Sequence, residues 1–292
     1  MTESTRLPSR LVQLSPTQHD RDSAGLTYVY PVLSRRAGGV SVGINLNPNN
    51  ACNWRCIYCQ VPDLVRGSGP PIDLAQLERE LRQVLAAIAT GNLFDEGVPA
   101  AQRAVVDFAL SGNGEPTSSP QFDAAIELLG RVRDESPSLC QLPIVLITNG
   151  SLADRAEVKR AISRLSSLGG RVWFKLDRGT DAGLLETNST TTSLARHVAR
   201  LETVARLCPT FIQSCWYSTD GHAPPQPELD AFVEQIATLV GKGVPLSGVQ
   251  LYTVARQPQQ PAGQKLSALS LDWLEQLALP LRKLGLPVTV SP

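Results

Sequence analysis

Short apolar runs alternate with longer amphipathic segments along most of the chain, from Val40 to the last residues. The short runs have the length of strands, and the segments between them repeat apolar residues at the three- and four-residue spacing of a helix. Strands are expected at residues 40–47, 104–111, 144–149, 171–177, 211–216 and 248–254, with a late one at 288–291. This alternation predicts an α/β fold whose parallel strands are joined by right-handed crossovers.

Residues that can cap a helix stand before the amphipathic segments. Ser and Asp side chains accept the free N–H groups of a first turn, and Pro fits there. We expect helices to begin at Asp73, Ser119, Asp154, Ser193, Pro227 and Ser270. Asp154 and Glu157 have the spacing of a capping box. Pro280 should kink or end the last helix, because it removes one backbone hydrogen bond.

The two faces of the expected strands differ in polarity. Side chains alternate along a strand, so Val42, Ile44 and Leu46 share one face. The opposite face carries Gly43, Asn45 and Asn47, and later strands repeat the pattern. A doubly wound sheet would be apolar on both faces, and a closed eight-stranded barrel would fill its interior with branched apolar residues. Six strands with one polar face instead predict a partial (β/α)6 TIM-like barrel, with helices outside and a roomy polar cavity inside.

The N-terminal stretch lacks this alternation. Residues 1–39 are polar and rich in Pro and Gly without a clear period, which is typical of an irregular arm. Its basic pair, Arg35-Arg36, is expected in a solvated turn. We therefore expect two parts, an arm of residues 1–39 and one barrel domain of residues 40–292.

Charge and cysteine content limit the functional classes. The 292 residues include 27 Lys and Arg against 27 Asp and Glu. No overall field would steer a polyanion, so nucleic-acid binding is not indicated by charge. The sequence shows neither an apolar signal core nor a run long enough to span a bilayer, so no membrane association is expected. Three of the six cysteines are bunched together, unlike a disulfide framework, and a reducing cytoplasm is the expected location.

Cys52, Cys56 and Cys59 fall within eight positions, spaced C-x3-C-x2-C, directly after the first expected strand. They should lie at that strand's carboxyl end, where the active sites of parallel α/β folds collect. Three thiolates leave a four-coordinate site one ligand short, and soft sulfur ligands favour zinc or an iron–sulfur cluster. A structural zinc site would draw a fourth ligand from a second pair. The other cysteines stand singly at Cys140, Cys208 and Cys215. An open-sited iron–sulfur cluster is the favoured interpretation, and zinc is the alternative.

Polar residues follow the next three expected strands. The second strand ends in Ser-Gly-Asn-Gly-Glu-Pro-Thr at residues 111–117, the third in Thr148-Asn149-Gly150, and the fourth in Lys175-Leu176-Asp177. The carboxyl ends of parallel strands share one edge, so these residues should lie on the same rim as the cysteines. Two plainer interpretations stay open: Asn149-Gly150 is also an ordinary turn sequence, and Lys175 with Asp177 could form an internal ion pair.

The segment Cys52-x3-Cys56-x-Tyr58-Cys59, with Asn113-Gly114-Glu115-Pro116 after the second strand, resembles the radical S-adenosylmethionine (SAM) superfamily. The resemblance runs from about residue 28 to the C-terminus and is closest to the branch that includes the wyosine-type tRNA-modifying enzymes. It implies that the thiolates bind three irons of a [4Fe–4S] cluster and that the fourth iron takes the amino and carboxylate groups of SAM. One electron then breaks the sulfonium bond, and the resulting 5′-deoxyadenosyl radical abstracts hydrogen from a substrate. This chemistry needs a low-potential cluster and a site closed to solvent.

The same resemblance assigns expected roles to residues of the other strand ends. Tyr58 would lie beside the cluster near the adenine. Asn113, Gly114 and Glu115 would receive the SAM ammonium group, with Asn113 standing where the family usually has glycine. The SAM ribose and carboxylate are expected at Asn149, Lys175 and Asp177.

Three functional hypotheses follow. The first is a radical SAM enzyme with an unidentified substrate and a reducing protein partner such as flavodoxin or ferredoxin. The second is a wyosine-type tRNA-modifying enzyme. That activity is disfavoured because the resemblance implies a second cluster bound ahead of the radical motif, and no cysteine precedes Cys52 in this sequence. The third is a non-catalytic protein that binds zinc or an iron–sulfur cluster.

Four further residues receive plainer expectations. His197 is expected to be a packing residue, Cys215 a small strand residue and His222 a solvated loop residue. Trp216 could pack in the core or stack on a substrate.

Overall fold

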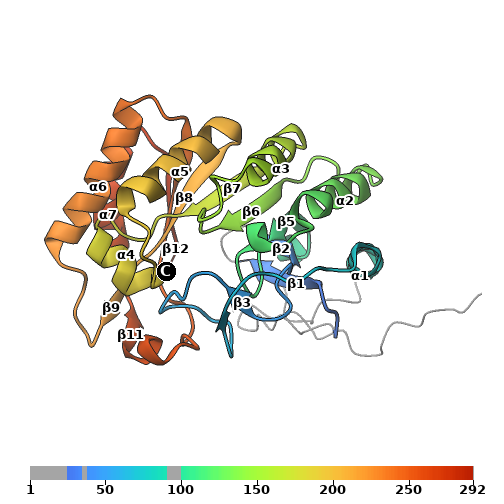
Figure 1. Ribbon diagram of the computed structural model, residues 1–292, viewed down its shortest axis with the longest axis horizontal. Coiled ribbons are helices and arrows are strands. Elements are labelled where there is room, and N and C mark those ends of the chain that lie inside the picture. The colour runs from blue at the N-terminus through green and yellow to red at the C-terminus, as the bar shows by residue number, and fades with distance from the viewer. Residues whose placement is uncertain (1–24, 35–37, 91–99, 292) are drawn as a thin grey trace, which may run out of the picture.

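A computed structural model describes residues 25–34, 38–90 and 100–291 of the protein. Its main sheet has eight strands in the order β1-β2-β5-β6-β7-β8-β10-β12. The strands are β1 (Val29–Ser34), β2 (Gly39–Ile44), β5 (Val105–Leu110), β6 (Ile144–Thr148), β7 (Arg171–Lys175), β8 (Thr210–Cys215), β10 (Leu246–Tyr252) and β12 (Val288–Ser291). All neighbours from β2 to β12 pair in parallel, and β1 pairs with β2 in antiparallel fashion. The sheet curls into a half-barrel (Figure 1), which confirms the expected partial barrel.

Seven α-helices connect or follow these strands in the described part of the chain. They are α1 (Leu74–Ala89), α2 (Phe122–Asp134), α3 (Ala156–Ser167), α4 (Asp181–Asn188), α5 (Leu194–Leu207), α6 (Gln226–Gly241) and α7 (Leu271–Lys283). The Asp73 carboxylate accepts the N–H groups of Ala75 and Gln76, which confirms the expected cap of α1. Ser193 and Ser270 cap α5 and α7 in the same way. None of the helices in this part of the chain combines the length and the apolar character that crossing a bilayer requires.

The structure differs from the expectations at three helices. Helix α3 has Arg155 as its N-cap without a side-chain hydrogen bond, because the Asp154 carboxylate accepts instead from Arg196 and Arg200 on α5. Helix α7 does not end at Pro280 but continues to Lys283, and a kink at Pro280 stays a prediction. Helix α4 was not expected at all, since its apolar residues form no single stripe: Leu184 is buried and the next residue, Leu185, is exposed.

The N-terminal arm is more regular than its composition predicts. Residues 29–34, expected to be irregular, form β1, and Gly39 already belongs to β2. The Tyr30 ring lies over Gly43 of β2, where any added Cβ would stand 2.3 Å from a ring atom. The Glu80 carboxylate accepts the N–H groups of residues 27–29 and ties β1 to α1. The pair Arg35-Arg36 lies outside the described residues, and the division into an arm and a barrel domain stays a prediction.

The outward face of the sheet is apolar and the inward face is polar, as the alternation predicts. Val42, Ile44 and Leu46 are fully buried and join one core with the helices. The inward face buries polar side chains that find protein partners, such as Ser41, whose hydroxyl donates to Asp107. Asn45 and Gln213 are also buried on this side. This arrangement orients the polar strand ends toward one rim, and the expected roomy cavity along the inner face stays a prediction.

Candidate functional site

The three clustered cysteines lie on a loop that leaves the carboxyl end of β2. Within this loop, β3 (Ala51–Cys52) pairs with β4 (Val65–Arg66), so Cys52 is held by backbone hydrogen bonds while Cys56 and Cys59 follow in the connecting turn. All three cysteines are half-buried and free of disulfides. We call residues 51–60 the cysteine loop.

Cys59 lies close enough to interact electrostatically with both Cys52 and Cys56. Burial raises the pKa of Cys52 to about 12 and also raises that of Cys56, and a charge on Cys59 would add to both shifts. In the described ranges, no three His, Cys, Asp or Glu side chains gather as the ligands of a single metal ion. A [4Fe–4S] cluster takes one thiolate at each of three irons and therefore needs a more widely spaced set of sulfurs. Three free thiols on one loop are the type and number of donors that such a cluster takes from a protein.

A small apolar cluster supports the loop from beneath. Tyr58 packs with Cys215, Tyr217 and Leu266, and the partly buried Cys56 lies against them. The Tyr58 and Tyr217 rings are 6.2 Å apart. This cluster is separate from the main core, so the loop has its own packed base.

Asp177, at the end of β7, holds the loop from the side. Its Oδ2 accepts the Tyr58 hydroxyl at 2.5 Å and the Asn188 amide at 2.7 Å, and its Oδ1 accepts the Cys215 backbone N–H at 2.9 Å. Lys175 lies nearby, with its Nζ 3.4 Å from the Tyr58 hydroxyl. No ion pair joins Lys175 to Asp177 in the part of the chain that the structure describes. The carboxylate of Asp177 is thus engaged by the protein's own donors.

Glu115 is buried in the loop after β5 and is surrounded by donors. Its Oε1 accepts from the backbone N–H and hydroxyl of Thr117 and from the Thr148 hydroxyl. Its Oε2 accepts the Asn149 N–H at 2.7 Å. Burial raises the pKa of Glu115, although these four donors pull it down. Glu115 lies close enough to Cys52 for its charge to raise the pKa of that thiol, and Oε2 retains capacity to accept from a ligand.

The segment before Glu115 packs directly on the cysteine loop. A Cβ on Gly114 would stand 2.0 Å from the carbonyl oxygen of Ala51, so only glycine fits there. The Asn113 N–H donates to the Asn45 side chain at 3.1 Å, and the Asn149 amide donates to Asn53 of the loop at 2.9 Å. The structure therefore brings Asn113, Gly114, Glu115 and Asn149 together around Cys52 and its neighbours.

Two late segments complete the rim. The Gln259 N–H donates to the Cys59 carbonyl at 2.9 Å, and a Cβ on Gly263 would stand 2.4 Å from the Ile57 carbonyl. Residues 256–266 thus lie against the cysteine loop. β9 (Tyr217–Thr219) pairs with β11 (Leu266–Ala268) beside them.

Comparison with known proteins agrees with this arrangement. The sequence model of the radical SAM superfamily matches residues 46–222, which include the cysteine loop and the ends of β5, β6, β7 and β8. The chain belongs to the radical SAM superfamily.

Two curated relatives of this radical SAM protein match only in part. A protein named GTPase Obg of Brachyspira hyodysenteriae is 26% identical over 129 residues, which are 44% of this chain and 16% of that protein. A UPF0026 protein of Methanocaldococcus jannaschii is 29% identical over 156 residues, 51% of this chain and 43% of that protein. The radical SAM chain therefore spans less than half the length of each of these relatives.

Solved structures share the fold at low identity. A radical SAM methyltransferase from Sphaerobacter thermophilus superposes with a TM-score of 0.60 at 15% identity, covering 90% of this chain and 68% of that one. TYW1 with a lysine-pyruvate adduct bound superposes with a TM-score of 0.56 at 14% identity, covering 83% and 73%. These likenesses identify the half-barrel as the fold of this radical SAM protein.

Other conspicuous residues of the radical SAM protein have structural roles. His197 is fully buried between Trp54 and Phe174, with ring centroids 5.2 and 5.0 Å away, which confirms the expected packing role. Trp216 lies in the main core, and Cys215 is buried in β8. His222 is exposed, as expected.

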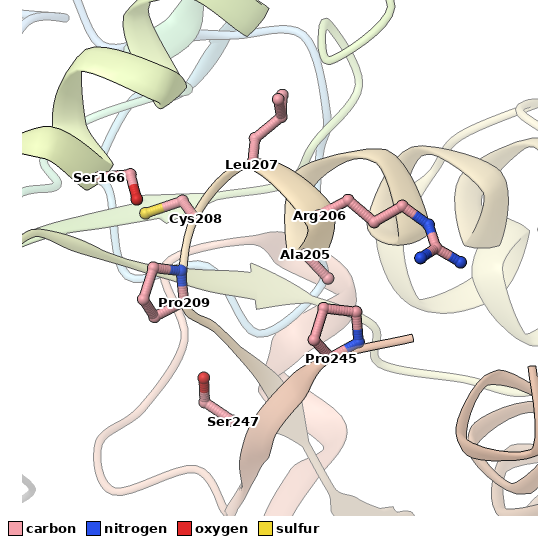
Figure 2. Close-up of a pocket in the computed structure, with 8 residues that line it drawn as sticks. All are labelled: Ser166, Ala205, Arg206, Leu207, Cys208, Pro209, Pro245 and Ser247. Atoms are coloured by element: carbon pink, nitrogen blue, oxygen red, sulfur yellow. The ribbon is translucent and has the colours of Figure 1, made fainter. Parts of the chain in front are cut away.

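The hollow drawn in Figure 2 lies at the opposite end of the sheet. It measures about 360 Å³ and is lined by Ser166, residues 205–209, Pro245 and Ser247. Pro209 and Pro245 precede the amino ends of β8 and β10, whereas the cysteine loop follows the carboxyl end of β2. The hollow, with Cys208 on its wall, is therefore separate from the radical SAM site.

One residue that contacts a cysteine was not predicted from the sequence. Asn188, the last residue of α4, donates its amide to the Cys56 sulfur at 3.2 Å. Its helix was not expected, and it lies 132 positions away along the chain. A single sequence offered no signal that could have paired them.

Proposed function

We propose that this protein is a radical SAM enzyme that holds a [4Fe–4S] cluster through Cys52, Cys56 and Cys59 and binds SAM at the remaining iron. When bound and reduced, such a cluster supplies the one electron that splits SAM into methionine and a 5′-deoxyadenosyl radical. The radical then takes a hydrogen atom from a substrate. The observation that carries the proposal is the cysteine loop, packed at the carboxyl rim against the Asn113–Glu115 segment. The zinc-binding and non-catalytic alternatives do not account for that second segment.

The chain's own residues have separable roles in this proposal. Glu115 receives the SAM ammonium group at Oε2, because among the described residues that oxygen accepts a single hydrogen bond, from the Asn149 N–H. Asn113 and Gly114 bring their backbone close to the loop, and Asn149 holds Asn53 in place. Lys175 offers a positive charge to the SAM carboxylate from the inner face of β7.

Tyr58 and Asp177 act together at the base of the loop. The hydrogen bond between them fixes the tyrosine ring beside the cysteines, where it can border the adenine. Since three protein donors already occupy the Asp177 carboxylate, its contribution to SAM binding is to orient Tyr58 and Asn188.

The reaction needs one electron, so we propose a reducing protein as a partner. A reducing protein such as flavodoxin or ferredoxin supplies that electron, and a cytoplasmic location keeps the thiols reduced. The substrate is unidentified. A wyosine-type activity is the second candidate within the class.

Anaerobic purification tests the proposal directly. We expect about four irons and four sulfides per chain, visible absorption that dithionite bleaches, and 5′-deoxyadenosine formed from SAM. Cys140→Ser is the matched control, since Cys140 lies outside the cysteine loop, and it should retain all three properties. A colourless protein that holds one zinc and forms no nucleoside would contradict the proposal.

Glu115→Ala tests the assignment of the SAM site. The variant should keep its iron and sulfide but bind SAM roughly tenfold more weakly or worse, a loss of about 1.4 kcal/mol or more. Calorimetric titration with SAM measures the affinity. Unchanged affinity in an iron-loaded variant would remove Glu115 from the SAM site.

A further inference from the structure

The carboxyl end of α4 forms hydrogen bonds with three consecutive residues of the cysteine loop, Arg55, Cys56 and Ile57. The Thr187 carbonyl accepts the Ile57 N–H at 2.9 Å, and the Asn188 carbonyl accepts the Arg55 N–H at 3.1 Å. Between them, the Asn188 side chain donates to the Cys56 sulfur. The last carbonyl groups of a helix have no partner within the helix, so α4 can supply them to the loop without losing its own hydrogen bonds.

The orientation of the Asn188 amide is fixed by its neighbours. Its Nδ2 donates to the Cys56 sulfur at 3.2 Å and to the Asp177 Oδ2 at 2.7 Å. An ionised carboxylate and a thiolate both accept hydrogen bonds and donate none, so a reversed amide would face two acceptors with its oxygen. Asn188 has no exposed surface, and the Asp177 carboxylate is itself held by Tyr58 and Cys215. The N–H group is therefore held in place against the sulfur.

Asn188 also stands between Cys56 and a negative charge. The amide of Asn188 hydrogen-bonds to both the Cys56 sulfur and the Asp177 carboxylate, so it lies between the thiol and that carboxylate. Cys52 has a different kind of donor, the backbone N–H of Trp54. The donor to Cys56 is a side chain and can be removed by substitution without altering the loop sequence.

We infer that Asn188 is a positioning residue that sets the reduction potential of the cluster through the Cys56 ligand. The inference rests on the proposed function. Reduction by one electron from flavodoxin, ferredoxin or dithionite increases the negative charge on the cluster and its sulfur ligands. A fixed N–H donor stabilises that charge more in the reduced state than in the oxidised state, which raises the potential. Without the amide, the Asp177 carboxylate would act on the sulfur unopposed and lower the potential further.

The test compares Asn188→Leu, which has the same branched shape but no donor, with Thr187→Val as a matched control. Thr187 is the buried neighbour on the same turn, and its hydroxyl bonds the Tyr217 hydroxyl at 2.8 Å rather than a sulfur. Each full-length protein is reconstituted anaerobically and titrated with mediators while the electron paramagnetic resonance signal of the reduced cluster is followed. Asn188→Leu should show a lower midpoint potential at unchanged iron content, and Thr187→Val should match the wild type.

A second readout separates the potential from the structure. With flavodoxin as the donor, Asn188→Leu should lose a larger share of its SAM cleavage than it loses with the stronger reductant dithionite. Asn188→Ala, which removes the donor without any overpacking, should shift the potential in the same direction.

Each outcome has a distinct meaning. An unchanged midpoint in iron-loaded Asn188→Leu and Asn188→Ala would overturn the inference while leaving the proposed function intact. Loss of iron from both variants, with iron retained in Thr187→Val, would also overturn the inference. Asn188 would then only hold the loop in the shape that binds the cluster. A wild-type protein that assembles no iron–sulfur cluster would instead contradict the proposed function.

Discussion

The outer side of the sheet and its carboxyl rim are stabilised by different interactions. On the outer side, Phe108, Val172 and Phe174 pack with the helices in one continuous apolar core. At the rim, buried polar residues hold the cysteine loop through hydrogen bonds: Asn188 donates to Cys56, and Asp177 accepts from Tyr58. Apolar burial depends on volume and tolerates similar side chains, whereas hydrogen bonds require particular atoms at particular positions. The fold should therefore depend mainly on the outer side, and the chemistry on the rim.

The largest effect should come from replacing a cluster ligand. Cys56→Ser should abolish the formation of 5′-deoxyadenosine from SAM, because one iron loses its sulfur ligand. The free energy of unfolding of the metal-free protein should change by no more than about 1 kcal/mol, since the side chain is only partly buried. Mass spectrometry of the nucleoside and urea denaturation give the two values. A variant that still forms the nucleoside would show that Cys56 is not a ligand.

The second largest effect should be on stability and should come from the outer side. Phe108 is fully buried in the main core, and Phe108→Ala should lower the free energy of unfolding by about 3–5 kcal/mol. At the rim, Asn53→Ala removes hydrogen bonds to Ser151 and Asn149 and should cost about 1–2 kcal/mol. Urea titrations of both metal-free proteins test the ranking. Equal losses would remove the distinction between the two regions.

The third effect concerns pH, at a residue that joins the two regions. His197 packs between Trp54 of the cysteine loop and Phe174 of the core, and burial lowers its pKa to about 4. Asp177 works against that shift and Arg200 adds to it. The unfolded chain binds a proton near pH 6.5 and the folded chain only near pH 4, so the stability contributed above pH 6.5 is lost as the pH falls through this window.

His197→Phe should flatten this part of the stability profile. The wild type should lose up to roughly 3 kcal/mol between pH 6.5 and pH 4 from this group, and the variant should lose less over the same range. Denaturation at a series of pH values measures both profiles. Parallel profiles would mean that His197 is not the buried titrating group.

The smallest effect should come from the surface between α3 and α5. Asp154, about half exposed, pairs with Arg200, and the Arg200 guanidinium holds the pKa of that carboxyl below its usual value. Asp154→Asn should cost about 1 kcal/mol or less at neutral pH. A lowered carboxyl pKa contributes stability above the unfolded value, so the difference should disappear as the pH falls through about 4 and below. Thermal denaturation of both proteins at a series of acidic pH values measures this difference.

The outer side was largely predictable from the sequence, because alternation of apolar residues encodes burial directly. The strands containing Val42, Phe108 and Val172 lie within three residues of their expected bounds. The cap at Asp73 was predictable for a similar reason, since it interacts with residues two and three positions away.

Features that depend on distant partners were not predictable. In strand β1, the Tyr30 ring packs over Gly43 of β2, which has no side chain to block it. Neither residue alone predicts this contact. The Asp154 carboxylate has the spacing of a cap, yet it pairs with arginines more than 40 positions away. At the site, the cysteine spacing identified the chemistry, but the contact between Asn188 and Cys56 depends on how an unexpected helix ends.

A half-barrel that never closes leaves two outer strands, and in the described part of the chain these are β1 and β12. A long, regular outer strand presents free backbone groups that another polypeptide can extend, which is a common route to aggregation. β1 includes Pro31, which has no N–H to offer, and β12 is only four residues long. Both ends of the sheet are thus poor templates for strand addition, and replacement of Pro31 would restore a backbone donor to one of them.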